Sequence, residues 1–170
     1  MKNLTKYLWL APLFVLIQIL LLNNVQFINY INPLVYLLLI ITLPQDTVKW
    51  FIILYAFLIG ILLDIFEGNI GLNSSSLVFI AFISTYVHKI MIPKNSIDIK
   101  DKLTLQTLGL KTFSVYAISI IFIHHLFLFS LENFSNSSIL FLLLKVFLST
   151  ITTFIIILIF QLFAYKVKEK

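Results

Sequence analysis

Six long runs of apolar residues, separated by short polar stretches, cover most of the chain. Each run approaches the roughly 20 residues that a helix needs to cross about 30 Å of hydrocarbon. The runs are continuously apolar and lack the alternation of a transmembrane barrel strand. The pattern therefore predicts an all-α integral membrane protein with six transmembrane helices, at about 4–22, 27–43, 48–66, 70–92, 111–131 and 139–165.

Lysine carries the whole orientation signal, because the chain has no arginine. The connections around Asn23, Gly68 and Asn133 contain no lysine, and positive charges favour the cytoplasmic side of a membrane. Both termini are therefore expected to be cytoplasmic, together with the loop at 93–110. The lysines on that side are Lys2, Lys6, Lys49, Lys89, Lys94, Lys100, Lys102, Lys111, Lys166, Lys168 and Lys170.

The amino-acid composition further limits the class of protein to which the chain can belong. With 61% hydrophobic residues, 11% charged residues and a mean hydropathy of +1.06, a soluble globular domain is excluded. The absence of cysteine excludes disulfides and cysteine-ligated metals. The net charge of +5 follows from the positive-inside pattern and favours anionic lipid headgroups, so it indicates no nucleic-acid partner. We expect one transmembrane domain over residues 1–170, with no cofactor.

Three segments need separate interpretation. Residues 4–22 begin like a secretory signal but lack a small-residue cleavage pattern, so we expect a retained first helix. The loop at 93–110 is expected to form a short interfacial helix before the fifth run. In the second run, Pro33 fits the first helical turn and Pro44 a helix stop. A re-entrant hairpin there would leave an odd number of crossings and separate the lysine-rich loops.

Polar residues concentrate where the third run ends. Gly60, Asp64 and Glu67 are spaced four and three apart and share one helix face. Gly60 allows close approach of another backbone, so we expect a bulky residue there to weaken partner assembly. Gly68 and Gly71 favour a tight turn into the fourth run. An acidic but unstructured loop end is the simpler alternative.

Asp64 is unexpected near a helix C-terminus, where the helix dipole disfavours negative charge. Two groups could stabilise it: the N-terminus of the fourth run, around Asn73, or Lys145 in the sixth run. Glu67 is expected to lie nearer water, so that Glu67→Gln has little effect.

A second polar group comprises His124, His125 and Lys145, at similar expected depths. Adjacent histidines diverge by about 100° on a helix and make a poor metal pair. We expect histidines hydrogen-bonded inside the bundle or at its interface, and no metal. The sequence also lacks a GxSxG turn, a phosphate-binding glycine loop and a cluster of aspartates for Mg²⁺, so no catalytic residues are expected.

Several of these residues carry a resemblance to the rod-shape-determining MreD family of the bacterial cell-elongation machinery. The second run starts with an Asn-Pro pair, and a Gly-x-x-x-Asp motif precedes a glycine turn. The segments that match are Asn32-Pro33-Leu34-Val35-Tyr36, Leu43-Pro44, Lys49-Trp50, Gly60-x-x-x-Asp64, Gly71-Leu72-Asn73 and Phe79-Ile80-Ala81-Phe82.

The resemblance implies a non-enzymatic scaffold in the bacterial inner membrane. Such a scaffold binds an MreC-type membrane protein and works with the actin-like MreB and with peptidoglycan synthases, and a homodimer within the complex is compatible with it. It also implies a fold similar to the six-helix substrate-binding subunits of energy-coupling-factor transporters. A small-solute-binding transporter subunit is therefore the alternative, with Asp64, His124, His125 and Lys145 as its candidate pocket residues.

Overall fold

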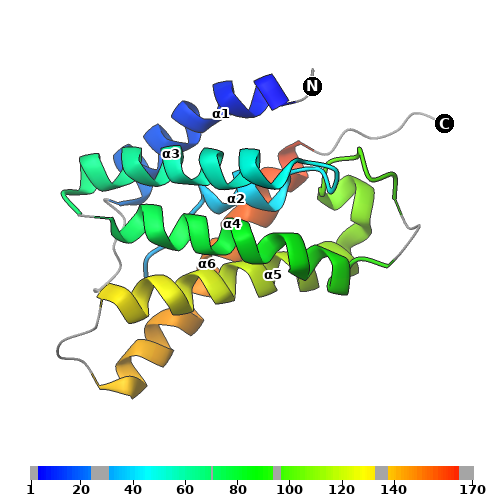
Figure 1. Cartoon of the computed structure of the whole chain (residues 1–170). Helices are drawn as coiled ribbons and strands as arrows, with labels where there is room; N and C mark the ends of the chain where they lie inside the picture. Colours follow the sequence, from blue (N-terminus) through cyan, green and yellow to red (C-terminus); the bar gives the residue numbers. More distant parts are fainter. Residues whose placement is uncertain (1–3, 24–30, 70, 94–96, 133–137, 165–170) are drawn as a thin grey trace.

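The computed structural model of the chain describes residues 4–23, 31–69, 71–93, 97–132 and 138–164, and this part is all-helical (Figure 1). Helix α1 continues directly into a π-helical turn, η1. In chain order the elements are α1 (Leu4–Ile17), η1 (Gln18–Leu22), α2 (Leu37–Ile41), α3 (Lys49–Glu67), α4 (Leu72–Met91), α5 (Leu105–Glu132) and α6 (Ile139–Phe163).

Four of these helices, α3 to α6, are long and apolar enough to cross a membrane. A shorter apolar helix, Tyr7–Leu22, comes from α1 and η1. The ranges expected at 48–66, 70–92, 111–131 and 139–165 fall on α3, α4, α5 and α6. Large apolar side chains such as Trp9, Ile90 and Phe163 remain exposed, as lipid-facing surfaces require.

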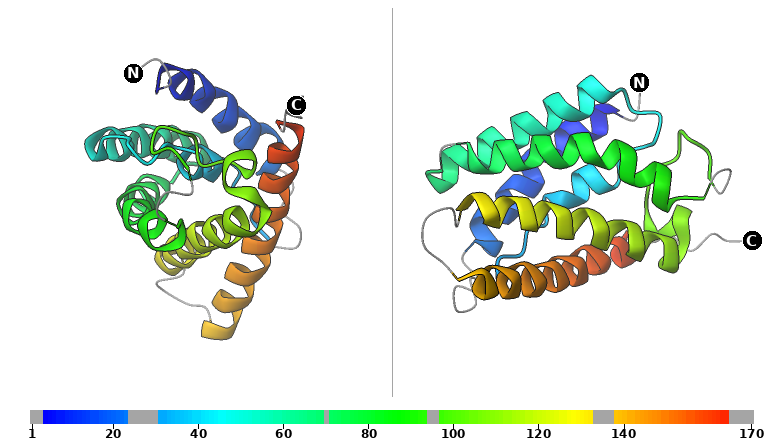
Figure 2. Two further views of the ribbon diagram at one scale, coloured as in Figure 1. Left: turned by 90° about the vertical axis from the view of Figure 1, so that its right-hand side faces the viewer. Right: turned by 60° about the horizontal axis from the view of Figure 1, so that its bottom comes forward.

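Helices α3 to α6 pack in sequence order, each against the next, and α1 lies along α3 (Figure 2). Two hydrogen bonds show that α1 and α3 run parallel. The Tyr55 hydroxyl donates to the Tyr7 carbonyl at 2.7 Å, and the Asn23 amide donates to Glu67 at 2.8 Å. The chain between α1 and α3 must therefore return along the bundle.

The bundle thus has two ends, which we name by their connections. The α3–α4 end contains Asn23 and Glu67. The α4–α5 end contains Tyr7 and Thr42, which are joined by a hydrogen bond from the Tyr7 hydroxyl to the Thr42 carbonyl at 2.7 Å. The start of α1 and the end of α6 lie toward this second end (Figure 1).

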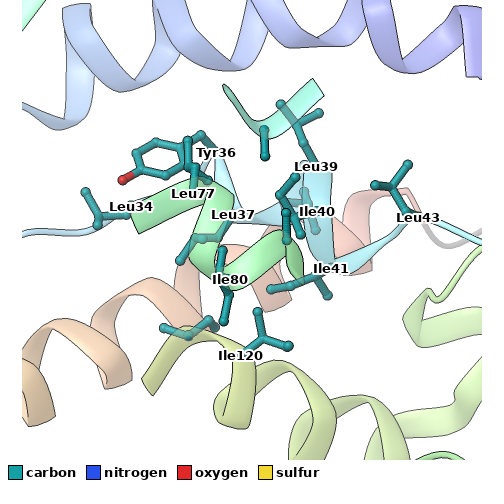
Figure 3. Packing of buried hydrophobic residues seen from close by; sticks show 14 of the residues in the cluster. Leu34, Tyr36, Leu37, Leu39, Ile40, Ile41, Leu43, Leu77, Ile80 and Ile120 are labelled. Carbon is teal, nitrogen blue, oxygen red and sulfur yellow. The ribbon is translucent and has the colours of Figure 1, made fainter. Parts of the chain in front are cut away.

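The centre of the bundle is occupied by α2 and the residues around it. Every residue from Leu34 to Leu43 is at most 8% exposed. Leu77 of α4 and Ile120 of α5 pack against this segment (Figure 3). A segment that is apolar on all sides is stable only when surrounded, so the sequence of 34–43 explains its central position.

The continuous helix expected over 27–43 is wrong within the described residues. Residues 24–30 lie outside the described part, residues 32–34 have no regular secondary structure, and α2 begins only at Leu37. Pro33 has no N–H, and the residue before a proline is disfavoured in a helix. The protein stabilises this unwound stretch with side chains from neighbouring helices, as described below.

The segment between α4 and α5 contains a short helical turn before the fifth span, as expected, and a sharp break follows that turn. Residues 105–108 form one helical turn, and Gly109 then interrupts α5 with φ 73° and ψ 163°. Such backbone angles are accessible essentially to glycine alone. The helix continues from Leu110, close to the expected start of the fifth span at 111.

Candidate functional site: a polar network around an unwound segment

The unwound segment Asn32–Tyr36 obtains its hydrogen-bond partners from three other elements. The Asn32 N–H donates to the Ser149 hydroxyl at 2.9 Å, and the Leu34 N–H donates to the Thr153 hydroxyl at 3.0 Å. Both hydroxyls come from α6. Buried backbone groups that lack partners are costly, and in a bilayer core water cannot replace them. These side chains therefore make a non-helical backbone stable at this depth.

Gln18 serves the opposite side of the same segment. Its side chain is fully buried at the start of η1. The amide nitrogen donates to the Pro33 carbonyl and to Asn23 Oδ1, both at 2.9 Å, while its oxygen accepts the Val35 N–H at 2.9 Å. One glutamine thus replaces two backbone hydrogen bonds that a continuous helix would have made. π-helical turns are frequent at functional positions, and here the turn begins at Gln18.

Asp64 stabilises the first turn of α4. Its two oxygens accept the N–H groups of Asn73 at 2.8 Å and of Ser74 at 3.0 Å, and also the Ser74 hydroxyl at 2.7 Å. These are the amides that an N-cap side chain normally accepts, and the N-cap residue here is Gly71, which has no side chain. Of the two partners left open by the sequence, Asp64 binds the α4 N-terminus.

The glycines place α3 and α4 in close contact. A Cβ added to Gly60 would overlap the Ser74 Cα and lie 2.7 Å from its nitrogen. Gly68 and Gly71 both adopt positive φ, as the expected tight turn requires. Gly60 therefore mediates packing within the chain. The expectation that a bulky residue at Gly60 weakens partner assembly stays a prediction.

Glu67 is more deeply involved than its expected position near water suggested. It is half-buried and accepts amide hydrogens from Asn23 at 2.8 Å, Asn69 at 3.2 Å and Asn73 at 2.7 Å. These donors connect the end of η1 to α3 and α4. The expectation that Glu67→Gln has little effect is therefore revised, because a glutamine amide would oppose at least one of the three donors.

The hydrogen bonds close into a ring that we call the polar ring. The Tyr36 hydroxyl donates to Asn73 Oδ1 at 3.4 Å, and Tyr36 directly follows Val35, whose N–H binds Gln18. The ring passes along η1 from Gln18 to its C-cap Asn23, continues through α3 and α4, and returns to the unwound segment. Its members are Gln18, Asn23, Glu67, Asn73 and Tyr36.

The two histidines occupy different environments on α5. His125 Nδ1 lies 2.8 Å from the Ile121 carbonyl, and Nε2 lies 3.4 Å from both the Asn32 carbonyl and the Thr153 hydroxyl. His125 therefore belongs to the support of the unwound segment. His124 is fully buried, has no hydrogen-bond partner among the described residues, and packs edge-on to Tyr36. The described residues contain no group of metal-ligating side chains.

Lys145 does not join the network around Asp64. Its ammonium lies 2.8 Å from Glu132 Oε2 and 4.4 Å from the centre of the Phe129 ring. The contact with the aromatic face adds to the ion pair, because the ring carries negative charge on its face. Lys145 therefore connects α6 to α5 independently of the polar ring.

A small cavity lies at the α3–α4 end, between the polar ring and α5. Its volume is about 60 Å³, and its polar lining residues are Asn32, Glu67, Asn69, Asn73 and Glu132. A water molecule takes up about 30 Å³ of liquid. The cavity thus has a size suited to one or two waters.

Sequence reasoning missed half of this site. Gln18, Asn23 and Tyr36 were not singled out, nor were Ser149 and Thr153. A signal existed in two places: Gln18 is a polar residue inside an apolar run, and Ser149 and Thr153 are four apart on one face of α6. The sequence did not indicate that these side chains bind a non-helical backbone.

The fold and this network define a helical membrane protein with an internal polar site. Comparison with protein-family models, with curated proteins and with solved structures gives no match.

Proposed function

We propose that the protein is a non-enzymatic scaffold of the bacterial cell-elongation machinery. It would sit in the inner membrane, bind an MreC-type protein and support lateral peptidoglycan synthesis with MreB and the synthases. The observation that supports this proposal is that several residues that carry the family resemblance lie in the unwound segment and at the α3–α4 turn, which the Tyr36–Asn73 hydrogen bond connects. Asn32 and Pro33 lie in the unwound segment, while Gly60, Asp64 and Asn73 join α3 to α4.

The size and chemistry of the site favour a scaffold over a solute-binding subunit. Most polar side chains near the unwound segment are engaged with its backbone or with each other. The cavity beside them is about 60 Å³. Pockets that enclose small-molecule ligands typically measure about 300–1,000 Å³. A rigid internal network that orients helices fits a protein whose outer surface binds other chains.

Six crossings with both termini cytoplasmic are part of the proposal. The parallel arrangement of α1 and α3 supports a returning second segment. Gln18 contacts Pro33, and Tyr7, 11 residues earlier on α1, contacts Thr42. Eleven residues of helix measure about 16 Å, which is about half of the roughly 30 Å thickness of the hydrocarbon. The segment from Pro33 to Thr42 therefore runs beside α1 over about that distance. The Lys100–Lys102 loop would then be cytoplasmic and Gly68 external.

Co-purification tests the scaffold proposal. The native full-length protein is extracted in mild detergent, and the bound chains and small molecules are identified by mass spectrometry. We expect an MreC-type chain in near-stoichiometric amount. A stoichiometric small solute, recovered without that chain, would contradict the scaffold and favour the transporter subunit.

Photo-crosslinking locates the partner face without disturbing the core. A photoreactive amino acid is placed at one exposed position on each of four helices, Trp9, Ile65, Ile90 and Phe147. A scaffold predicts protein adducts from one or two of these faces and lipid adducts from the others. Lipid adducts at all four positions would count against a stable protein partner.

Reporter fusions test the topology. A cytoplasm-dependent reporter is expected to work after Lys170 and within the loop at 94–102, and to fail near Asn69 and Asn136. Activity at Asn69 would refute the six-span arrangement.

A further inference from the structure

A second cavity lies where α1, α2 and α6 meet the start of α5 and the residues that precede it. Its volume is about 210 Å³. One part of its lining is apolar and includes Leu10, Phe14 and Leu39, while the other part is polar and includes Lys102, Thr104 and Gln106. The cavity therefore offers both apolar and polar contacts.

The apolar part lies between two helices that face lipid. The rings of Phe14 and Phe160 are 5.7 Å apart, which joins α1 to α6 on one side of the cavity. On the same stretch of α1, Trp9 is 83% exposed and Leu13 is 51% exposed. Because these helices present apolar side chains outward, we expect this part of the cavity to lie beside the acyl chains of the bilayer.

The polar part contains a positive charge. The Lys102 ammonium lies 5.0 Å from the centre of the Tyr7 ring, so its position is defined by a cation–π contact with α1. Lys102 belongs to the segment that carries Lys100 and Lys111, where the chain meets the membrane surface. Cationic side chains at that level attract anionic lipid headgroups.

We propose that this cavity binds one anionic phospholipid. Its phosphate would lie against Lys102, beside the Thr104 hydroxyl and the Gln106 amide. The first part of an acyl chain would pass along Leu10 and Phe14. The volume is below the about 300–1,000 Å³ of pockets that enclose a whole small molecule, which fits a ligand that remains largely in the bilayer. The proposal does not depend on the scaffold role.

Native mass spectrometry of the full-length protein tests the charge requirement. The protein is delipidated in mild detergent and titrated with phosphatidylglycerol or phosphatidylcholine. We expect one phosphatidylglycerol to bind with preference, and Lys102→Gln to weaken its binding about fivefold, the effect of one cation beside an anionic headgroup. Lys100→Gln, in the same loop but outside the cavity, is the matched control and should bind as the parent does.

A second pair of variants tests the apolar part. Leu10→Trp fills the cavity wall and should lower phosphatidylglycerol binding, whereas Leu13→Trp makes the same change on the exposed side of α1 and should not. Equal binding by Lys102→Gln and Lys100→Gln, or no preference for phosphatidylglycerol, would overturn the proposal. Displacement of the lipid by inorganic phosphate would also overturn it, because the site would then bind a free anion.

Crosslinking of the unaltered protein covers the case in which the variants fail to fold. A phosphatidylglycerol with a photoreactive acyl chain is added to the parent protein in detergent, and the adducts are mapped by proteolysis. Adducts should concentrate on the peptides that contain Leu10 and Phe14. Adducts distributed equally over α3 and α4 would refute a specific site.

Discussion

Two stretches of non-helical backbone, Asn32–Tyr36 before α2 and Gly109 within α5, contrast in how they are stabilised. Gly109 interrupts α5 with a single residue in a conformation suited to glycine, and the adjoining Leu110 is 62% exposed. The Asn32–Tyr36 stretch lies inside the bundle, where Val35 and Tyr36 are fully buried. Three separate elements supply side chains that bind its backbone.

The comparison shows where a membrane protein can contain non-helical backbone and which hydrogen-bond partners that backbone requires. The break at Gly109 lies at an exposed position, and its backbone angles suit glycine. A break inside the bundle needs one protein partner for each backbone group that the helix no longer satisfies. The non-helical segment Asn32–Tyr36 is thus coupled to the positions of η1, α5 and α6, whereas the break at Gly109 rests on the backbone angles of one residue of α5.

The largest effect is expected from Gln18→Leu. This change leaves the Pro33 carbonyl and the Val35 N–H buried without partners, at about 1–3 kcal/mol each. We expect the free energy of unfolding in detergent to fall by about 3 kcal/mol. The matched control is Gln161→Leu, which removes a single bond to the Leu105 N–H at 3.2 Å, near the other break. A loss for Gln161→Leu as large as that for Gln18→Leu would contradict the contrast.

Asp64→Leu is expected to have the second largest effect. The free energy of unfolding should fall by about 2 kcal/mol, because two N–H groups in the first turn of α4 lose their acceptor. Lys145→Leu should remove only the pairing with Glu132 and the contact with Phe129. Since Asp64 and Lys145 share no partner, their effects should add when both are changed. Thermal unfolding of the four proteins of this cycle measures the coupling. A combined cost well below the sum would mean that the lysine supports the aspartate.

Thr153→Val should lower the free energy of unfolding by about 1–2 kcal/mol, although the volume of the side chain hardly changes. It removes the acceptor of the Leu34 N–H and a neighbour of His125. The adjacent Thr152→Val serves as control, because the Thr152 hydroxyl only donates to the Leu148 carbonyl of its own helix. Chemical unfolding in detergent compares the two variants. If both lost the same stability, the unwound segment would not depend on α6.

Gly109→Ala is expected to have the smallest effect, about 1 kcal/mol, which comes from backbone strain at a positive φ. Space is not the reason, because a Cβ there would meet nothing within 4 Å. The loss should therefore be the same for Gly109→Ala and Gly109→Ser in thermal unfolding. A much larger loss for serine would indicate a packed environment around this break.

Much of the fold followed from hydrophobic pattern alone. The ranges predicted for α3, α4, α5 and α6 were close because a membrane helix satisfies its own backbone and needs only length and apolarity. The helix predicted over 27–43 was wrong in its described part, because the backbone of residues 32–34 is not satisfied within a helix of its own. Residues 34–36 are as apolar as the residues of the predicted helices, but several backbone groups of the segment bind side chains that are distant in the sequence, such as Ser149 of α6. No local pattern contains that information.

The candidate site was predictable in part. Gly60, Asp64 and Gly71 lie close together in sequence, so their spacing indicated the α3–α4 turn, and the α4 N-terminus was one of two partners expected for Asp64. Glu67 was misjudged because its donors, Asn23 among them, come from another helix. Lys145 was the other partner expected for Asp64, and the structure instead pairs the Lys145 ammonium with Glu132 at 2.8 Å.

Hydrogen exchange of individual amides, measured by NMR in lipid nanodiscs, tests the central claim most directly. We predict that the N–H groups of Leu34 and Val35 exchange at least about 100-fold more slowly than those of Leu110 and Lys111, which follow the break at Gly109. Gln18→Leu should accelerate exchange at Val35 while leaving Leu110 unchanged. Fast exchange at Leu34 and Val35 in the parent protein would contradict a backbone held by side chains from neighbouring helices.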